Sequence, residues 1–585
     1  MCGNGTNNQQ QETMFITRYF TLFLLTITYA LQLNAQSGIL SSQVGYDTNE
    51  VKKIFIRSDQ AHFIKEKTAF KIVNIQNGKT FKGQVKKWGS KWNATWWIAD
   101  FSKLKKEGSY QLLLQNAKGQ SLSSDTFKIG DHILWKNSYN VIAHDLLDQR
   151  AREARVGKGW RDCGSDLQEF SSHAVTIDGL GDILENSDKV LSKEEHEYLR
   201  NQLVRGCDFL AYLQDKAKEI KLGDGAVIHE DRQDHVVTGN VAKAAKMFAK
   251  SSRLLRGYND SKSKEYEMRA KKAFQWIHQN GPVVNEEEQL FYASVHGAPK
   301  GAVPPAKQWM TRDLVTMISA AIELYDLGNT EYKALAINYA DKVMARQVSK
   351  QDNEDGLYGH FYTYSDYSQF GGVKFTEKAN IHCGAHSKDG RMYNKGGHYP
   401  HYILPFIKMI EEWGSDAKAK EWRSTVSNFA YGYFIPACGQ SPFMILPSGF
   451  YKDQGLLYFG SWYHGHNNIY SFAATLALVF EKFFKDDQFR SIAVGNIQWI
   501  AGLNCGLKEK DSPGYLSYSM ISGIGNRYRG SWTNIAGSIC NGFSASPQFK
   551  ITEPSLAKDL PVYFDDEDYI AHTFPFLSAL IRFQK

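Results

Sequence analysis

The spacing of apolar residues changes at about residue 130, and this change decides which folds the chain can adopt. Before it, short apolar or alternating runs at 53–56, 70–73 and 110–114 are separated by Asn-Gly and Lys-Gly turns. Alternation of this kind predicts the strands of a small antiparallel β-sandwich. After it, apolar residues recur at helical spacing. The second part is therefore expected to form a separate helical domain.

Amphipathic helices are expected over most of the second part. They are predicted at 240–255, 265–279, 314–327, 331–347, 399–413, 469–484 and 489–503. At 585 residues and 42% hydrophobic content the chain exceeds what a single core accommodates, so at least two domains are expected. Connections of unequal length favour a closed ring of helical hairpins over a regular solenoid. The Gly- and aromatic-rich connections at 352–398 and 508–564 are expected to build a binding face.

The N-terminal 36 residues have the pattern of an upstream extension followed by a signal peptide. Arg18 precedes the apolar run 19–31, and the small residue Ala35 comes before Gln36. This pattern predicts cleavage near Gln36 and a secreted or periplasmic protein. The alternative is a retained N-terminal membrane helix. No later stretch approaches the length of a membrane span, so the mature protein is expected to have none.

Cysteine usage and charge exclude several classes of function. Six of the seven cysteines are scattered without a Cys-x-x-Cys pair, which argues against a zinc ribbon and a disulfide-dense scaffold. Free buried thiols are expected instead, and the alternative is that some pair in an oxidising periplasm. The net charge of +7 is spread along the chain, so nucleic acid is not an expected partner. A mildly basic surface favours an acidic polysaccharide.

Four segments in the first part carry a resemblance to a known domain. The segments 42–46, 99–102, 107–110 and 127–130 resemble, in order, the immunoglobulin-like domain that precedes many catalytic domains of glycoside hydrolase family 9. The resemblance implies an immunoglobulin-like β-sandwich over 37–130 and an all-α (α/α)6 barrel over 131–585. It also implies that a poly- or oligosaccharide is the substrate.

The segment 159–170 resembles the family motif in which Trp, one residue and then Asp-Ala-Gly-Asp supply two aspartates that hold and deprotonate the attacking water. Asp162 matches the first aspartate, and Asp166 matches the second if one residue is inserted. Trp160 is the matching tryptophan and a candidate contact with substrate. An insertion in a tight loop displaces a carboxylate and is costly to catalysis. The competing interpretation is a capped turn.

The segment 564–577 resembles the C-terminal family motif in which an Asn-Glu pair precedes a short helix containing Ala-Pro-Phe-Leu. Glu567 occupies the position of the general acid, and Asp566 stands where Asn is common. Neighbouring acids disfavour ionisation of one more carboxyl, which suits a proton donor. The competing interpretation is a solvated acidic helix N-terminus stabilised by the helix dipole.

Further substrate contacts are predicted around a Gly-x-Asn turn at 502–504. The stretch 517–525, which includes Tyr518, resembles the family's Ser-Tyr-x-x-Gly-x-Gly segment. The family's Pro-His-His-Arg is replaced by a stretch with Arg527 and Arg529. An arginine fork suits a carboxylate or sulfate on the substrate. Plain surface arginines are the competing interpretation.

Two histidine clusters complete the candidate residues. Trp462, His464 and His466 precede a helix where the family places a segment facing its cleft, and their side chains suit stacking and hydrogen bonding to a sugar. His382 and His386, with His398 and His401, have approximate metal-ligand spacing but lack a paired motif. No metal site is predicted. The family chemistry requires no cofactor and leaves a structural calcium ion open.

The resemblance implies inverting hydrolysis of β-linked glucans by two carboxyl groups ~6.5–9.5 Å apart. Two departures, the insertion before Asp166 and the missing histidine pair, favour another β-linked glycan, anionic and attacked from a chain end. A second hypothesis is a lyase or dehydratase acting on uronic-acid-containing oligosaccharides on the same scaffold. A third is a glycan-binding protein without catalysis.

Overall fold

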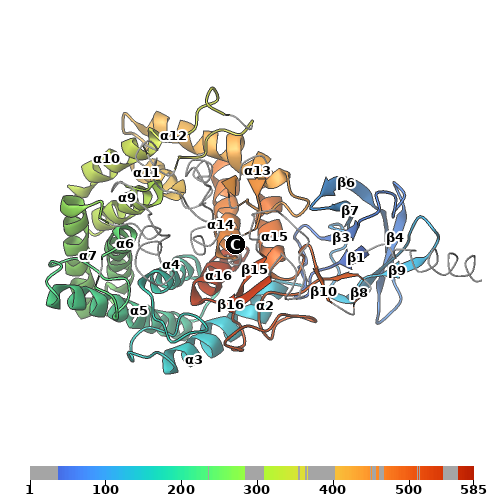
Figure 1. Ribbon diagram of the computed structural model, residues 1–585, viewed down its shortest axis with the longest axis horizontal. Coiled ribbons are helices and arrows are strands. Elements are labelled where there is room, and N and C mark those ends of the chain that lie inside the picture. The colour runs from blue at the N-terminus through green and yellow to red at the C-terminus, as the bar shows by residue number, and fades with distance from the viewer. Residues whose placement is uncertain are drawn as a thin grey trace, which may run out of the picture.

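The computed structural model contains a β-sandwich beside a ring of helices (Figure 1). It describes residues 37–234, 236–283, 309–353, 356–362, 365, 402–447, 449–450, 456–459, 467–509, 512, 514–543 and 564–584. No helix in these ranges is both long and apolar enough to cross a lipid bilayer. Five cysteines in the described ranges, Cys163, Cys207, Cys438, Cys505 and Cys540, are free and buried, which confirms the prediction for them.

Ten strands form two sheets before residue 131. They are β1 (Ser37–Leu40), β2 (Tyr46–Asp47), β3 (Lys53–Ser58), β4 (Ala69–Asn74), β5 (Thr80–Gln84), β6 (Lys86–Lys91), β7 (Ala94–Asp100), β8 (Gly108–Gln115), β9 (Ser121–Ser123) and β10 (Phe127–Gly130). One sheet has the order β1-β3-β7-β6, and the other has the order β2-β10-β8-β4-β5 with β9 on β8. The pairs are antiparallel except β2 with β10, which is parallel and departs from the predicted antiparallel pattern.

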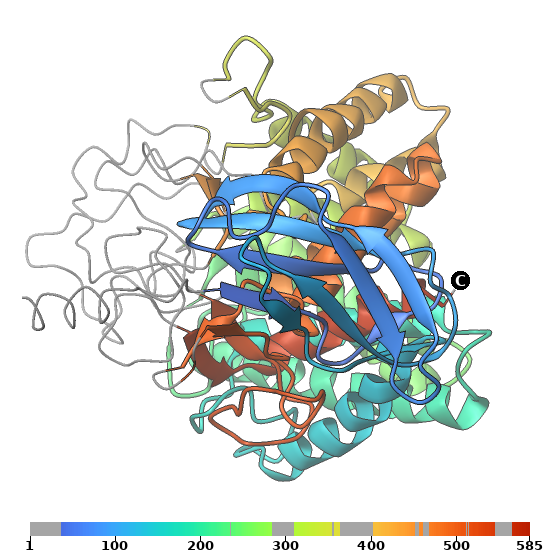
Figure 2. The same cartoon turned by 90° about the vertical axis from the view of Figure 1, so that its right-hand side faces the viewer.

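The burial pattern of the strands shows which sheet faces the helices. In β4 the side chains alternate, with Phe70 and Ile72 buried and Lys71 exposed. In β3 both faces are buried, because Phe55 packs on Phe443 of the helical domain with ring centroids 4.3 Å apart. An amphipathic strand needs only one covered face. The doubly buried β3 therefore marks the sheet that joins the two domains. This sheet lies on the helical side of the sandwich in Figure 1, and Figure 2 shows the sandwich in front of the helices.

The helical domain begins three residues after β10. Its helices are α2 (Ile133–Asn140), α3 (Leu147–Arg152), α4 (Phe170–Asn186), α5 (Lys193–Glu219), α6 (Thr238–Leu255), α7 (Asp260–Asn280), α9 (Thr311–Asp326), α10 (Tyr332–Met344), α11 (Leu404–Trp413), α12 (Ala419–Ser427), α13 (Ile435–Gly439), α14 (Asn467–Phe484), α15 (Gln488–Ile500) and α16 (Thr573–Arg582), with π-helical turns η1 (Val141–Leu146) and η4 (Asn428–Phe434) and the 3-10 turn η6 (Ile570–His572). Short strands pair between them: β11 (Gly449–Phe450) with β12 (Leu456–Leu457), β13 (Leu507–Lys508) with β14 (Tyr515–Leu516), and β15 (Cys540–Phe543) with β16 (Phe564–Asp568).

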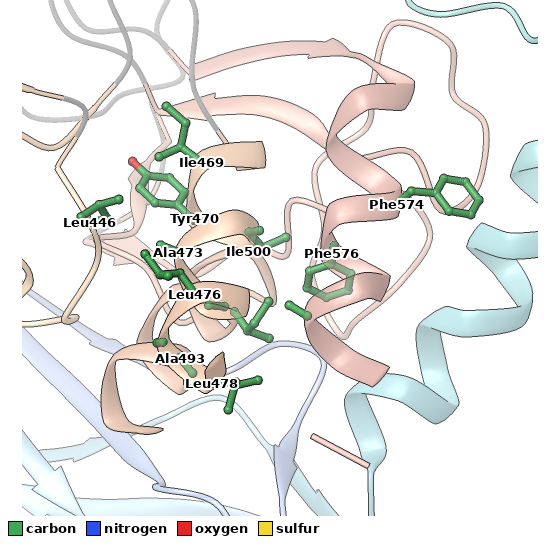
Figure 3. Packing of buried hydrophobic residues seen from close by; sticks show 14 of the residues in the cluster. Leu446, Ile469, Tyr470, Ala473, Leu476, Leu478, Ala493, Ile500, Phe574 and Phe576 are labelled. Atoms are coloured by element: carbon green, nitrogen blue, oxygen red, sulfur yellow. The ribbon is translucent and has the colours of Figure 1, made fainter. Parts of the chain in front are cut away.

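The helices are arranged in two layers around one interior. Side chains of α4, α6, α9, α11, α14 and α16 line the same cavity, and α5, α7 and α10 lie outside them (Figure 1). In α4 the lining positions, such as Val175, Gly179 and Asp182, recur every three or four residues, the spacing of one helix face. On α16, Phe574 and Phe576 point to opposite sides, with Phe576 toward the apolar cluster of α14 and α15 (Figure 3).

Neighbouring inner helices run parallel to one another. Gly239, in the first turn of α6, lies against Asp313 in the first turn of α9. Near the other end, Arg253 Nε donates to Glu323 Oε2 at 2.9 Å. The same direction holds for α4 and α6, since Lys246 Nζ lies 2.6 Å from Asp178 Oδ2 and Arg253 reaches Glu185. The N-termini of α4, α6 and α9 therefore share one end of the ring.

A buried ion pair closes the ring between its first and last parts. Arg150 in α3 donates to Asp568 in β16, and both side chains are fully buried. Arg150 also donates to the carbonyl oxygen of Arg161 at 3.1 Å and to Ser538 Oγ at 3.1 Å. Thr533 Oγ1 donates to Asp568 Oδ2 at 2.5 Å. The two charges therefore have several partners apart from each other.

The sandwich is tied to the same region of the helical domain. Asn526 N donates to Gln43 O at 3.0 Å, and Gln43 N donates to Ala501 O at 3.0 Å. Arg527 Nη1 donates to Asp125 Oδ2 at 2.7 Å across the junction, and this pair is about one third exposed. The segment after α15 is therefore held between the two domains.

Arg150→Met is expected to lower the free energy of unfolding by about 3–5 kcal/mol, because it leaves the carboxylate of Asp568 buried without its counter-charge. Arg527→Met removes a matched arginine–aspartate pair that is partly exposed, and its cost is expected at ~0–1 kcal/mol. Urea titration of both variants measures the difference. Equal losses in the two variants would contradict a special role for the buried pair.

Candidate active site

One cavity of about 1310 Å³ runs along the inside of the helical ring. At the end where the inner helices begin, the wall is formed by side chains from loops, from β15 and β16, and from η6. They are Cys163, Ser165, Glu169, His229, Glu230, Trp532, Asn541, Glu567, Tyr569 and His572. Because the N-termini of α4, α6 and α9 meet at this end, their dipoles favour negative charge there. Three glutamates, Glu169, Glu230 and Glu567, are on this wall.

Glu567 is the acid of its run that faces the cavity. The run belongs to β16, which pairs with β15 in the register Cys540–Asp568 and Gly542–Asp565. Asp565 accepts a hydrogen bond from Asn541 Nδ2 at 2.7 Å, and Asp566 accepts one from Trp532 Nε1 at 3.0 Å. The fourth acid, Asp568, is the partner of Arg150. Glu567 is 8% exposed and lines the cavity.

The aspartate segment lies directly against the glutamate segment. Ile570 N donates to Asp162 O at 2.7 Å. The Asp162 side chain is fully buried, and its Oδ2 accepts from the backbone N–H of Glu169 at 2.9 Å. Burial and the negative charge of Glu169 raise the pKa of Asp162. The two sequence motifs are thus brought together, although Asp162 itself lies behind the cavity wall.

Asp166 has a different environment from Asp162. Its side chain is 68% exposed and accepts from Arg232 at 3.2 and 3.4 Å. It is not among the residues that line the cavity. The structure therefore places the two predicted aspartates apart, one buried and one on the surface of the loop.

Three of the predicted substrate contacts lie away from the cavity: Trp160, Tyr518 and Arg527. Trp160 is fully buried, stacks on His173, and donates from Nε1 to Gln202 at 3.1 Å. Tyr518 donates to Glu509, and the guanidinium of Arg527 lies 5.6 Å from its ring. Arg527 pairs with Asp125 of the sandwich. None of the three lines the cavity.

Arg529 and Trp532 lie next to the glutamate segment. Arg529 Nη2 donates to Asp566 Oδ2 at 3.3 Å, and its guanidinium lies 5.5 Å from the ring of Phe564. The ring of Trp532 packs against Gly164, where an added Cβ would lie 2.7 Å from Trp532 Cε3. Trp532 thus contacts both motifs, and it is 59% exposed at the cavity.

Sequence reasoning did not identify Glu169, His229, Glu230, Trp532 or Tyr569 as wall residues. Glu169 directly precedes α4, so its place at a helix start was the available signal. His229 and Glu230 follow an isolated bridge between Ile228 and Val236, which is too short to leave a strand pattern. Trp532 lies in the connection 508–564, which was expected to build a binding face. Tyr569 follows Glu567 by two residues. Burial and the nearby charges of Glu567, Glu169 and Asp162 raise the pKa of Tyr569.

Some predicted residues lie outside the described ranges: Trp462, His464, His466, His382, His386, His398 and His401. Among the residues that are described, no group of three or more His, Cys, Asp or Glu side chains is arranged to hold a metal ion.

Comparisons with known proteins agree on the identity of both parts. The family model for the cellulase N-terminal immunoglobulin-like domain matches residues 34–118, and that for glycosyl hydrolase family 9 matches residues 119–529. The second match ends before Glu567. No curated protein matches the chain in sequence.

Solved structures resemble the chain over almost its whole length. A metagenome-derived glycoside hydrolase family 9 endoglucanase matches with a TM-score of 0.61 at 16% sequence identity. The matched part covers 93% of this chain and 99% of the endoglucanase chain. AaCel9A, in complex with cellobiose-like isofagomine, has a TM-score of 0.59 at 13% identity, with coverages of 94% and 99%. The endoglucanase J30, also of family 9, has a TM-score of 0.58 at 15% identity, with coverages of 92% and 99%. At sequence identities this low, the similarity shows that the folds are alike and nothing more.

Neither comparison supports the lyase or dehydratase alternative. The chain, an immunoglobulin-like domain followed by a helical domain, belongs to glycosyl hydrolase family 9.

Proposed function

We propose that this protein is a secreted, inverting glycoside hydrolase that cleaves a β-linked poly- or oligosaccharide. The contact between the two acidic segments supports this most directly, because Ile570 N bonds to Asp162 O and places Glu567 on the same cavity wall as the aspartate loop. Residues 1–36, with the pattern of a signal peptide, support secretion.

The helical domain is proposed to be an (α/α)6 barrel. Six helices among the described residues, α4, α6, α9, α11, α14 and α16, line one cavity. Most are followed by a helix that packs against them from outside, as α5 does on α4 and α7 does on α6. Parallel inner helices and antiparallel hairpins are the features expected of that barrel.

Glu567 is proposed to donate the proton to the leaving oxygen. A proton donor has to face the substrate, and Glu567 is the acid of β16 that lines the cavity. Its three acidic neighbours have partners of their own in Asn541, Trp532 and Arg150. Water then attacks the anomeric carbon from the opposite face of the sugar, which inverts its configuration. The assignment of that water to Asp162 and Asp166 stays a prediction from the resemblance.

Trp532 is proposed to stack on a sugar ring at the cavity. Its indole N–H is bound to Asp566 and its ring packs on Gly164, so its orientation is fixed while most of the side chain stays exposed. A rigid aromatic face of this kind buries the apolar face of a pyranose at little entropic cost. An anionic glycan as substrate stays a prediction from the sequence, because basic side chains of the cavity wall have acids beside them, as Arg312 has Asp313.

Glu567→Gln is expected to lower kcat on a β-1,4-linked oligosaccharide by roughly 10²–10⁴-fold, because the leaving oxygen no longer receives a proton. On 2,4-dinitrophenyl β-cellobioside, whose leaving group needs no proton, the same variant is expected to retain most of its activity. Mass spectrometry of the natural-substrate products should show the gain of one water. Wild-type rates on both substrates would rule out Glu567 as the donor.

Trp532→Ala is expected to raise KM for an oligosaccharide by about tenfold with little change in kcat, since ~1–1.5 kcal/mol of stacking is lost from ground state and transition state alike. Tyr528→Ala serves as the matched control, because Tyr528 is 48% exposed and does not line the cavity. Initial rates across substrate concentrations distinguish the two. A larger KM change for Tyr528→Ala than for Trp532→Ala would mean that the sugar ring does not stack on Trp532.

A further inference from the structure

We propose that Glu169, at the start of α4, is the general base that activates the attacking water, in place of Asp166. This proposal rests on the proposed function, because it assigns the second carboxylate of the same hydrolysis. Asp166 and Glu169 differ in their contacts, in the groups that orient them and in their access to the cavity wall that carries Glu567.

Asp166 is directed away from the cavity. Its carboxylate is held by Arg232, and its backbone oxygen accepts from Arg155 Nε at 3.3 Å. With its side chain 68% exposed and off the cavity wall, it does not reach a water beside a sugar bound there. A base has to come within hydrogen-bond distance of the proton that it removes.

Glu169 lies on the cavity wall and is held there from both sides of its backbone. Its N–H donates to Asp162 Oδ2 at 2.9 Å, and its carbonyl oxygen lies 2.7 Å from His173 Nδ1. Its side chain is 26% exposed, enough to meet a water in the cavity. Asp162, the aspartate that matches the motif without an insertion, therefore positions Glu169.

His229 orients the carboxylate of Glu169. His229 Nε2 lies 3.5 Å from Glu169 Oε1, and His229 Nδ1 lies 2.9 Å from Asn240 Nδ2. The amide of Asn240 donates to Nδ1, which leaves the ring proton on Nε2, facing Glu169. A base that is oriented by a second group, itself held by a third, is the arrangement found at activated catalytic groups.

Glu169 and Glu567 act on the same space. Both line the same end of the cavity, and Asp162 links their segments, because it accepts from Glu169 N at 2.9 Å through Oδ2 and from Ile570 N at 2.7 Å through its carbonyl oxygen. Glu230, the third glutamate of this wall, is 4% exposed, and its Oε2 lies 3.6 Å from Arg232 Nη2. Its carboxyl group is therefore less accessible to a water in the cavity than that of Glu169, and a base has to reach the proton that it removes. Glu169 is thus the better placed of the two remaining wall glutamates.

The proposed step is balanced in atoms and electrons. The water oxygen forms a bond to the anomeric carbon while Glu169 takes one proton from that water. The glycosidic C–O bond breaks, its electrons stay with the leaving oxygen, and Glu567 gives that oxygen a proton. One water is consumed, and solvent returns Glu169 to its carboxylate and Glu567 to its acid.

The test compares Glu169→Gln with Asp166→Asn on 2,4-dinitrophenyl β-cellobioside, which needs a base but no acid. For Glu169→Gln, which keeps an oxygen facing His229, we expect kcat to fall by roughly 10²–10⁴-fold with an unchanged unfolding midpoint. For Asp166→Asn we expect a loss of less than about tenfold. Glu219→Gln, an exposed change at the end of α5, should match the wild type.

Chemical rescue separates a base from a merely structural residue. Azide carries its own negative charge and needs no base, so added azide should restore turnover of Glu169→Ala and yield the α-glycosyl azide. A Glu169→Gln enzyme with near wild-type kcat, or azide rescue of Asp166→Ala in place of Glu169→Ala, would overturn the proposal. Failure of the proposed function would be different, because the wild type itself would then release neither dinitrophenol nor reducing sugar from any glycoside.

Discussion

The closure of the helical ring is the constraint on which the candidate site depends. Arg150 and Asp568 are 418 residues apart in sequence, and their buried pair joins α3 to the strand that carries Glu567. Ile570 N adds a second link to Asp162 O. Bringing such distant segments together costs loop entropy, which grows slowly with length, and packing of α16 on α4 offsets it. The two acidic segments therefore acquire their relative position only when the whole ring has formed.

The sandwich contributes to this arrangement through the segment that precedes Trp532. Asn526 and Arg527 are bound to the sandwich through Gln43, Thr126 and Asp125. A few residues later, Arg529 and Trp532 contact Asp566. The segment is fixed at one end by the sandwich and at the other by the glutamate strand. The sandwich thus stabilises the cavity wall, and the ion pair between Arg527 and Asp125 is one of the contacts through which it does so.

The sequence predicted the fold well and the site in part, for reasons that differ between residues. Helices such as α6, α9 and α14 were found because their buried faces repeat at helical spacing. α5 was not among the predicted helices, although its buried residues, such as Leu199, Leu203 and Leu210, also recur at helical spacing. Glu567, which lies on the cavity wall, could be singled out because the Pro-Phe-Leu sequence after it sets its register in the motif. Asp166 and Glu169 could not be told apart, since spacing along a loop with an inserted residue does not determine which carboxylate turns inward.

Charge is distributed unevenly along the cavity, and this follows from the direction of the inner helices. At the end where α4, α6 and α9 begin, carboxyl groups gather on the wall and the helix dipoles offset part of their repulsion. Further along the helices several acids have a base beside them, as Asp178 has Lys246 and Lys250, and Asp182 has Arg582. Those pairs lower the pKa of Asp178 and Asp182 and hold them as carboxylates. Near Asp162 and Glu230, burial dominates and raises the pKa instead. One ring of parallel helices thus provides an end where acids can hold or accept a proton and, further along, a part where several acids join helices.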